Sequence, residues 1–169
     1  MLISAHAGYP RWVSSGADFI EMDVRLNAHG VIIDSHDEPR PGANHATLDE
    51  ILEAVQGRVG LHLDMKEPGY EVDLLSRVLN RLPPRQVVAT PDFQESVSAI
   101  KANFPEVRVS PIDIVAVDHR YAHNSYGVPI WVWTVDDKKR MRRFMADPRI
   151  ECLITNRPDL ALKLRKARW

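Results

Sequence analysis

The alternation of short apolar runs with amphipathic segments is the feature that most limits the folds open to this chain. Several of the nine apolar runs are continuous and rich in β-branched residues, which is typical of strands buried on both faces. Helix-like segments between them indicate a mostly parallel sheet with helices packed outside it. The predicted strands cover residues 2–5, 19–26, 31–36, 60–65, 86–90, 107–111, 114–117, 129–135 and 151–155.

About eight parallel strands favour a closed barrel, but the length of the chain sets a limit. A (β/α)8 barrel usually takes about 250 residues, and this chain has 169. We therefore predict an α/β fold, a trimmed (β/α)8 TIM-type barrel with some outer helices shortened or missing, as a single domain over residues 1–169. Uncovered strands would need a homodimer across the gap or loops folded over it. The predicted helices cover residues 47–56, 71–81, 93–103, 138–146 and 159–166.

Two carboxylates lie on the second predicted strand. Glu21 and Asp23 are two residues apart, so their side chains share a face of that strand. Like charges on one face repel each other unless a cation lies between them. Carboxylate oxygens are the ligands that Mg²⁺ and Ca²⁺ prefer. The pair therefore predicts a site for one of these divalent ions.

The turn that follows this strand predicts a hairpin. Asn and Gly are common turn residues, and the four residues 27–30 separate two apolar runs. Pairing Asn27 with Gly30 would place Asp23 opposite Asp34 and Glu21 opposite His36, with all four side chains on one face. An edge hairpin with a polar outer face is the alternative interpretation.

Composition excludes several classes of protein. A net charge of −1 argues against a general nucleic-acid binder. The single Cys152 rules out an internal disulfide and fits a reducing compartment. We see no transmembrane segment and no secretory signal, so we expect a cytoplasmic protein. Five basic residues between Lys138 and Arg143 are interpreted as a solvated helix face rather than a site for anionic lipid or phosphate.

Polar side chains recur where the predicted strands end. Catalytic groups of (β/α)8 barrels lie at the carboxyl ends of the strands, so these residues are expected to meet at one rim. A single His at such a position is more often structural than catalytic, but several titratable groups at equivalent positions are less easily explained by chance. The residues concerned are His6, Glu21, Asp23, His36, Asp37, Asp64, Lys66, Trp133, Thr134, Asp136 and Asn156.

Five short motifs, in this order along the chain, resemble those of the glycerophosphodiester phosphodiesterases, a family of the phosphatidylinositol-phospholipase-C-like superfamily. The resemblance extends from His6 to Pro158. The motifs are Gly16-Ala17-Asp18-Phe19-Ile20-Glu21-Met22-Asp23-Val24, Ser35-His36-Asp37, Leu61-His62-Leu63-Asp64-Met65-Lys66, Trp131-Val132-Trp133-Thr134-Val135-Asp136 and Ile154-Thr155-Asn156-Arg157-Pro158.

The resemblance implies metal-dependent hydrolysis of a glycerophosphodiester, a small molecule of lipid metabolism, to an alcohol and glycerol phosphate. It implies that the divalent ion is bound by three carboxylates, that two histidines act as the acid–base pair and that a lysine contacts the phosphate. Two aromatic residues would wall the alcohol pocket. The residues implied are Glu21, Asp23 and Asp64 for the metal, His6, His36 and Lys66 for catalysis, and Phe93 and Trp133, with Lys66, for substrate.

The chain departs from the family pattern in places. The usual His-Arg-Gly motif is His6-Ala7-Gly8 here, and alanine cannot replace a phosphate-binding guanidinium. The third metal ligand is usually Glu but is Asp64 in this sequence. An Asp ligand and a first His without Arg also resemble the sphingomyelinase D group, which cleaves choline-type head groups. A non-catalytic relative that binds phosphate esters is the third alternative.

Overall fold

The computed structural model describes residues 1–40 and 42–167. Its strands form one sheet of nine members within these residues. Three of the predicted strands, β1, β2 and β4, have the predicted bounds. The strands are β1 (Leu2–Ala5), β2 (Phe19–Leu26), β3 (Ile32–Asp34), β4 (Gly60–Met65), β5 (Val87–Pro91), β6 (Arg108–Val109), β7 (Val115–Asp118), β8 (Ile130–Trp133) and β9 (Ile150–Thr155).

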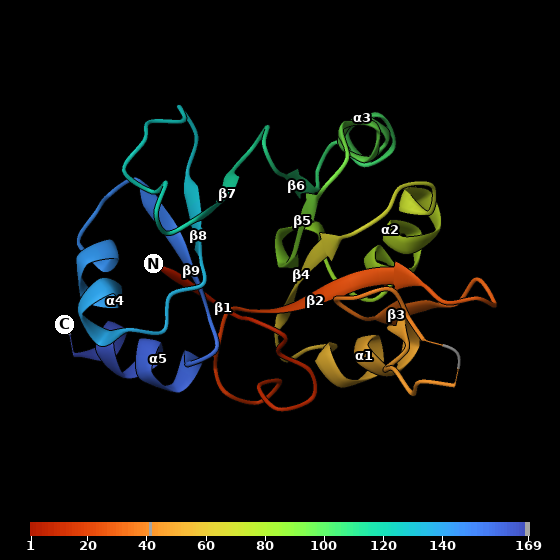
Figure 1. Ribbon diagram of the computed structural model, residues 1–169, viewed down its shortest axis with the longest axis horizontal. Helices are drawn as coiled ribbons and strands as arrows, with labels where there is room; N and C mark the ends of the chain where they lie inside the picture. The colour runs from red at the N-terminus through yellow and green to blue at the C-terminus, as the bar shows by residue number, and fades with distance from the viewer. Residues whose placement is uncertain (41, 168–169) are drawn as a thin grey trace.

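The sheet curls into an open half-barrel, which is the trimmed (β/α)8 TIM-type barrel predicted (Figure 1). Eight strands pair in parallel in the order β6-β5-β4-β2-β1-β9-β8-β7, and β3 pairs antiparallel with β2. Closure would require pairing of β6 with β7, and the described residues show no such ladder. Side chains join the two sides instead: the Ala116 N–H donates to Ser110 Oγ at 3.3 Å, and Arg108 of β6 donates from Nη2 to Glu151 Oε2 of β9 at 2.7 Å.

Five helices pack on the outer surface of this sheet in the described residues. They are α1 (Leu48–Val55), α2 (Glu71–Leu79), α3 (Gln94–Asn103), α4 (Lys138–Met145) and α5 (Pro158–Lys166). Thr47 caps α1 in a capping box, with Glu50 as its partner. No described helix lies between β1 and β2, between β6 and β7 or between β7 and β8, so the prediction of missing outer helices is confirmed.

The predicted register of the β2–β3 hairpin is wrong by one residue. Val24, not Asp23, pairs with Asp34. The Asn27 N–H donates to the Val31 carbonyl at 3.0 Å, so the loop holds three residues rather than two. Gly30 has a φ of 74° and supplies the left-handed residue that such a loop needs. The four side chains therefore do not form the single face that the two-residue turn would create.

A small apolar cluster fills the inside of the half-barrel beneath the carboxyl ends of the strands. Trp131 is its largest member and is fully buried. The Trp131 ring packs edge-on against His62, with the ring centroids 5.2 Å apart, and its Nε1 donates to Glu151 Oε2 at 2.7 Å. This packing supports the floor of the rim where the polar residues gather. The cluster consists of Phe19, Val88, Ile114, Trp131, Cys152 and Ile154.

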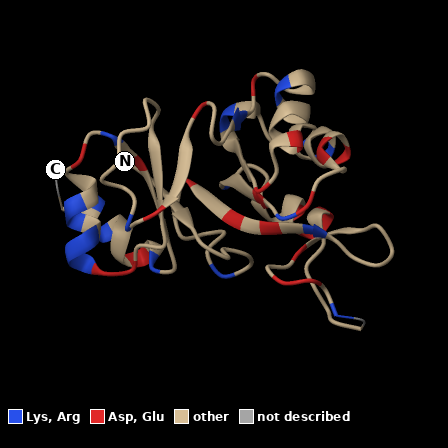
Figure 2. Ribbon diagram, turned by 45° about the horizontal axis from the view of Figure 1, so that its top comes forward, with Lys and Arg blue, Asp and Glu red and all other residues tan. Residues whose placement is uncertain are grey.

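The basic residues predicted on one helix face all lie exposed on α4. Figure 2 shows them gathered beside those of α5, at the end of the molecule away from α1 to α3. The buried residues of α4 are Met141, Phe144 and Met145, so the helix has the apolar stripe expected of one packed on a sheet. Among the described residues, no helix is long and apolar enough to pass through a bilayer.

Candidate functional site

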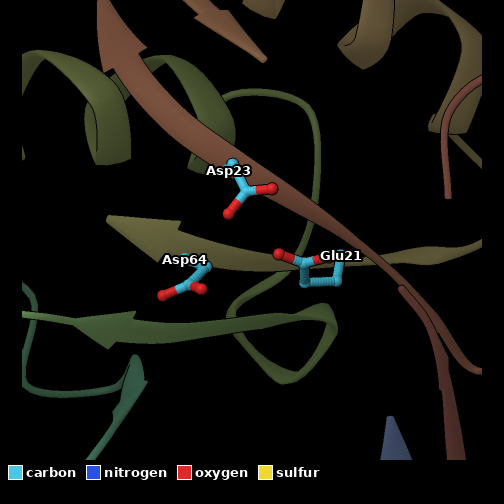
Figure 3. A group of neighbouring side chains, drawn as sticks. All are labelled: Glu21, Asp23 and Asp64. Carbon is cyan, nitrogen blue, oxygen red and sulfur yellow. The ribbon is translucent and has the colours of Figure 1, made fainter. Parts of the chain in front are cut away.

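Three carboxylates predicted to bind a metal lie together at the carboxyl ends of neighbouring strands. Glu21 and Asp23 come from β2, and Asp64 comes from β4, where it pairs in register with Asp23. One oxygen from each carboxylate lies within 4.8 Å of the other two. Figure 3 shows the three groups pointing into a common space from the two strands. The parallel register therefore unites residues that are 41 positions apart in the sequence.

The pKa of Glu21 departs strongly from its usual value. Burial, reinforced by the charge of Asp23, raises the pKa of Glu21 to about 8. The Ala7 N–H opposes this by donating to Glu21 Oε2 at 2.7 Å. Ala7 has a positive φ of 44°, a conformation unusual for a residue with a Cβ. The strained backbone of the first loop is thus fixed against the Glu21 carboxylate.

Lys66 contributes the positive charge of the cluster. Its Nζ lies 2.6 Å from Asp64 Oδ2 and 3.1 Å from Asp23 Oδ1. Burial by itself lowers the pKa of Lys66, but the bonds to the two carboxylates outweigh that effect and raise the pKa above its usual value. Lys66 is therefore an ammonium ion that offsets part of the negative charge of the cluster.

These groups border a cavity of about 380 Å³ at the rim of the half-barrel. Its wall unites seven of the eight residues that the sequence predicted for catalysis, metal and substrate. Phe93 is the exception: it is 42% exposed, precedes α3 and does not line the cavity. The lining consists of His6, Glu21, Asp23, His36, His62, Asp64, Lys66, Thr90, Pro91, Asp92, Ser110, Ala116, Trp133, Thr134 and Ile154.

Both predicted acid–base histidines lie on this wall, each with one ring nitrogen bonded. His6 Nδ1 lies 3.0 Å from Asn156 Oδ1. His36 Nδ1 lies 2.9 Å from Asp37 Oδ1, and Arg25 Nε donates to the His36 carbonyl at 3.1 Å. No described residue hydrogen-bonds to Nε2 of either ring. Each histidine therefore has one nitrogen available for proton exchange with a molecule in the cavity.

A buried polar chain behind Asp64 includes Thr90, a residue that the sequence reasoning missed. Thr90 Oγ1 donates to Asp64 Oδ1 at 3.2 Å and lies 3.0 Å from His62 Nε2. His62 Nδ1 lies 3.3 Å from Ser4 Oγ. Burial lowers the pKa of His62 to about 4, so its ring is neutral near pH 7. His62 is thus an interior histidine with both ring nitrogens bonded, and it also lines the cavity.

The donors of the carboxylate cluster fit a hard divalent ion. All three are oxygen ligands, their spacing suits a shared ion, and Lys66 leaves the cluster with an excess of negative charge. The same excess of negative charge contributes to the raised pKa of Glu21. These residues would therefore hold a divalent metal ion with its charge balanced.

Comparison with solved structures identifies relatives in fold. A glycerophosphodiester phosphodiesterase from Parabacteroides distasonis has a TM-score of 0.81 at 18% identity, covering 99% of this chain and 97% of its own. One from Agrobacterium tumefaciens has a TM-score of 0.74 at 21% identity, covering 95% and 99%. An Oleispira antarctica phosphodiesterase, solved with the product sn-glycerol-3-phosphate, has a TM-score of 0.80 at 14% identity, covering 99% and 96%. No protein-family model and no curated protein matches the sequence.

Proposed function

We propose that this chain, which has the fold of the glycerophosphodiester phosphodiesterases, is a metal-dependent phosphoric diester hydrolase. Its substrate would be a glycerophosphodiester, cleaved to an alcohol and glycerol phosphate. The observation that carries the proposal is the joint presence of three carboxylates, a lysine and two histidines around one cavity. A structural neighbour that binds sn-glycerol-3-phosphate supports this choice of substrate.

The charges of the site suit an anionic phosphodiester. Glu21, Asp23 and Asp64 would hold Mg²⁺ or Ca²⁺, which supplies positive charge next to the phosphoryl oxygens when bound. Lys66 Nζ would turn from Asp64 toward the phosphate and stabilise the negative charge that grows in the transition state. Trp133 is 42% exposed on the cavity wall and would pack against the alcohol portion of the substrate.

The two histidines would perform the proton transfers. One imidazole takes the proton of the attacking hydroxyl, and the other gives a proton to the leaving alkoxide. Their Nε2 atoms suit these roles because no described residue hydrogen-bonds to them, while Nδ1 of each ring is held by a neighbouring side chain. Because His6 follows β1 and His36 follows β3, the pair approaches the cavity from separate loops.

Two alternatives remain in view. Head-group cleavage of the sphingomyelinase D type would use the same carboxylates and histidines on a choline phospholipid. A binding protein without turnover is favoured by one observation, that Ala7 stands where the family has a phosphate-binding arginine.

Cys152 is buried and fits a reducing compartment, so we propose a cytoplasmic enzyme. The homodimer stays a prediction, which the mass in solution would test.

A metal-by-substrate panel tests the function. The purified protein is assayed with Mg²⁺, Ca²⁺ or EDTA on glycerophosphocholine, glycerophosphoethanolamine and a bis-aryl phosphodiester, with His6→Ala and Glu21→Ala as controls. Release of alcohol only with a divalent ion, and loss of it in both variants, is the expected result. Metal binding by calorimetry without turnover on any substrate would favour the binding protein over the enzyme.

A further inference from the structure

Asn156 lies between His6 and the Asp136 carboxylate at the rim of the half-barrel. Its Oδ1 is 3.0 Å from His6 Nδ1, and its Nδ2 donates to Asp136 Oδ2 at 2.8 Å. The other Asp136 oxygen, Oδ1, accepts from the Asn156 N–H and from Thr155 Oγ1, each at 2.8 Å. Asp136 thus receives three hydrogen bonds from the residues that end β9.

The carboxylate decides which way the Asn156 amide faces. An ionised carboxylate only accepts hydrogen bonds, so the group turned toward Asp136 must be the amide donor, Nδ2. Although burial raises the pKa of Asp136, the bonds from Asn156 and Thr155 outweigh it and lower the pKa, which keeps the group ionised near neutral pH. The amide oxygen must therefore face His6.

We infer that Asp136 and Asn156 are positioning residues that fix the neutral His6 ring as its Nδ1–H tautomer. An amide oxygen accepts only, so His6 Nδ1 must carry the proton that it shares with Asn156. The lone pair of the neutral ring then lies on Nε2, which has no hydrogen-bond partner in residues 1–40 and 42–167. Because His6 lines the cavity, Nε2 is the nitrogen left to take a proton there.

The catalytic consequence rests on the proposed function, but the tautomer itself does not. With Nε2 unprotonated, His6 accepts the proton of the attacking hydroxyl and becomes an imidazolium, whose Nδ1–H remains bonded to Asn156 Oδ1. With the opposite tautomer, Nε2 would already carry a proton and the ring would present no base to the cavity. Asp136 and Asn156 thus make Nε2 of the neutral His6 ring a proton acceptor in the cavity.

The variant Asp136→Asn tests the assignment by reversing it. Its Oδ1 would keep the two bonds from Asn156 N–H and Thr155 Oγ1, so the new amide nitrogen would face the Asn156 side chain. Two donors cannot face each other, and the Asn156 amide would therefore turn its oxygen to residue 136 and its nitrogen to His6. His6 Nδ1 would become an acceptor, and the ring proton would move to Nε2.

Nitrogen-15 NMR of the histidine rings reads this tautomer directly, with the His6 signals assigned by their loss in His6→Ala. We expect an Nδ1–H ring in the wild type and in the matched control Asp49→Asn, which lies on α1. We expect an Nε2–H ring in Asp136→Asn. The double variant Asp136→Asn/Asn156→Asp exchanges the two side chains, returns an acceptor to His6 and should restore the Nδ1–H ring.

Kinetics give the second measurement. Asp136→Asn should lower kcat by on the order of 10²-fold with little change in KM, and the exchanged double variant should recover most of the loss. A wild-type ring in the Nε2–H form, or a ring unchanged by Asp136→Asn in a folded protein, overturns the inference. If the rings switch as expected but wild-type protein hydrolyses no substrate, the tautomer assignment stands and the proposed function fails.

Discussion

The buried Glu21 carboxylate predicts that the metal-free protein loses stability as the pH rises. Its pKa is raised from 4.5 to about 8, first by burial and then by the charge of Asp23. Below pH 4.5 Glu21 is protonated in both folded and unfolded states, so it imposes no penalty. Between the two values the folded state keeps a proton that the unfolded state has lost, so the free energy of unfolding falls as the pH increases.

The size of this loss follows from the two pKa values. The difference between about 8 and 4.5, at about 1.4 kcal/mol for each pH unit, amounts to about 5 kcal/mol once the pH exceeds the folded pKa. That is a large share of the roughly 5–15 kcal/mol that stabilises a typical domain. The pKa of Asp34 is also raised, to about 6, mainly by burial, so it adds a loss of the same sign at lower pH.

Glu21→Gln isolates the part due to Glu21. Glutamine keeps the shape and an oxygen that accepts from the Ala7 N–H, but it has no proton to lose. Urea unfolding in EDTA, from about pH 5 to about pH 9, should show the wild type losing on the order of several kcal/mol more than the variant. Ca²⁺ or Mg²⁺ should remove most of this difference in the wild type by supplying the missing charge, and should leave the variant nearly unchanged.

The reasoning is refuted if the free energy of unfolding changes with pH by the same amount, within about 1 kcal/mol, in the wild type and in Glu21→Gln. That result would mean that water or the Lys66 ammonium already stabilises the ionised carboxylate in the folded protein. The difference between the two curves is the quantity to compare, because titrating groups away from the carboxylate cluster contribute equally to both.

Two further changes follow from the site and the loop beneath it. His36→Ala should abolish hydrolysis yet leave the metal affinity measured by calorimetry nearly intact, because His36 bonds to Asp37 and not to the carboxylate cluster. An equal loss of activity and metal affinity would mean that His36 serves the metal site or the fold. Gly8→Ala would bring a Cβ to 2.6 Å from Ile20 Cβ and 2.8 Å from the Ala5 carbonyl oxygen, and such overpacking should cost about 1–3 kcal/mol in urea unfolding. If Gly8→Ala is as stable as the wild type, the backbone of the first loop must shift to make room for the added Cβ at no cost in stability.

The fold was predictable where burial alone decides the structure. In β2 and β4 apolar residues alternate with polar ones, and this period of two is typical of a strand with one apolar face, so both strands could be found from the sequence. The hairpin register was not predictable in this way, because one left-handed residue at Gly30 lengthens the loop and shifts every pair. The ladder of β6 is also shorter than the predicted run, since Pro111 has no N–H to donate.

The site was predictable as far as strand ends reveal it. Residues such as Asp64 and Trp133 end their strands, and parallel pairing then brings them to one rim. Thr90 was missed because a threonine at the end of a buried strand carries no sequence signal beyond its β-propensity. Phe93 was expected in the pocket from the resemblance, but it precedes α3 and does not line the cavity.

The ammonium of Lys66, held between two carboxylates, has a consequence for which ions the protein selects. An incoming cation must displace an internal charge that is already bonded at 2.6 and 3.1 Å. A monovalent ion such as Na⁺ would replace one unit of positive charge by another. It would gain no electrostatic energy to offset the free energy that it loses on giving up its bound water. An ion of higher valence would gain charge in that exchange, so Lys66 would disfavour the binding of alkali metal ions at the carboxylate cluster.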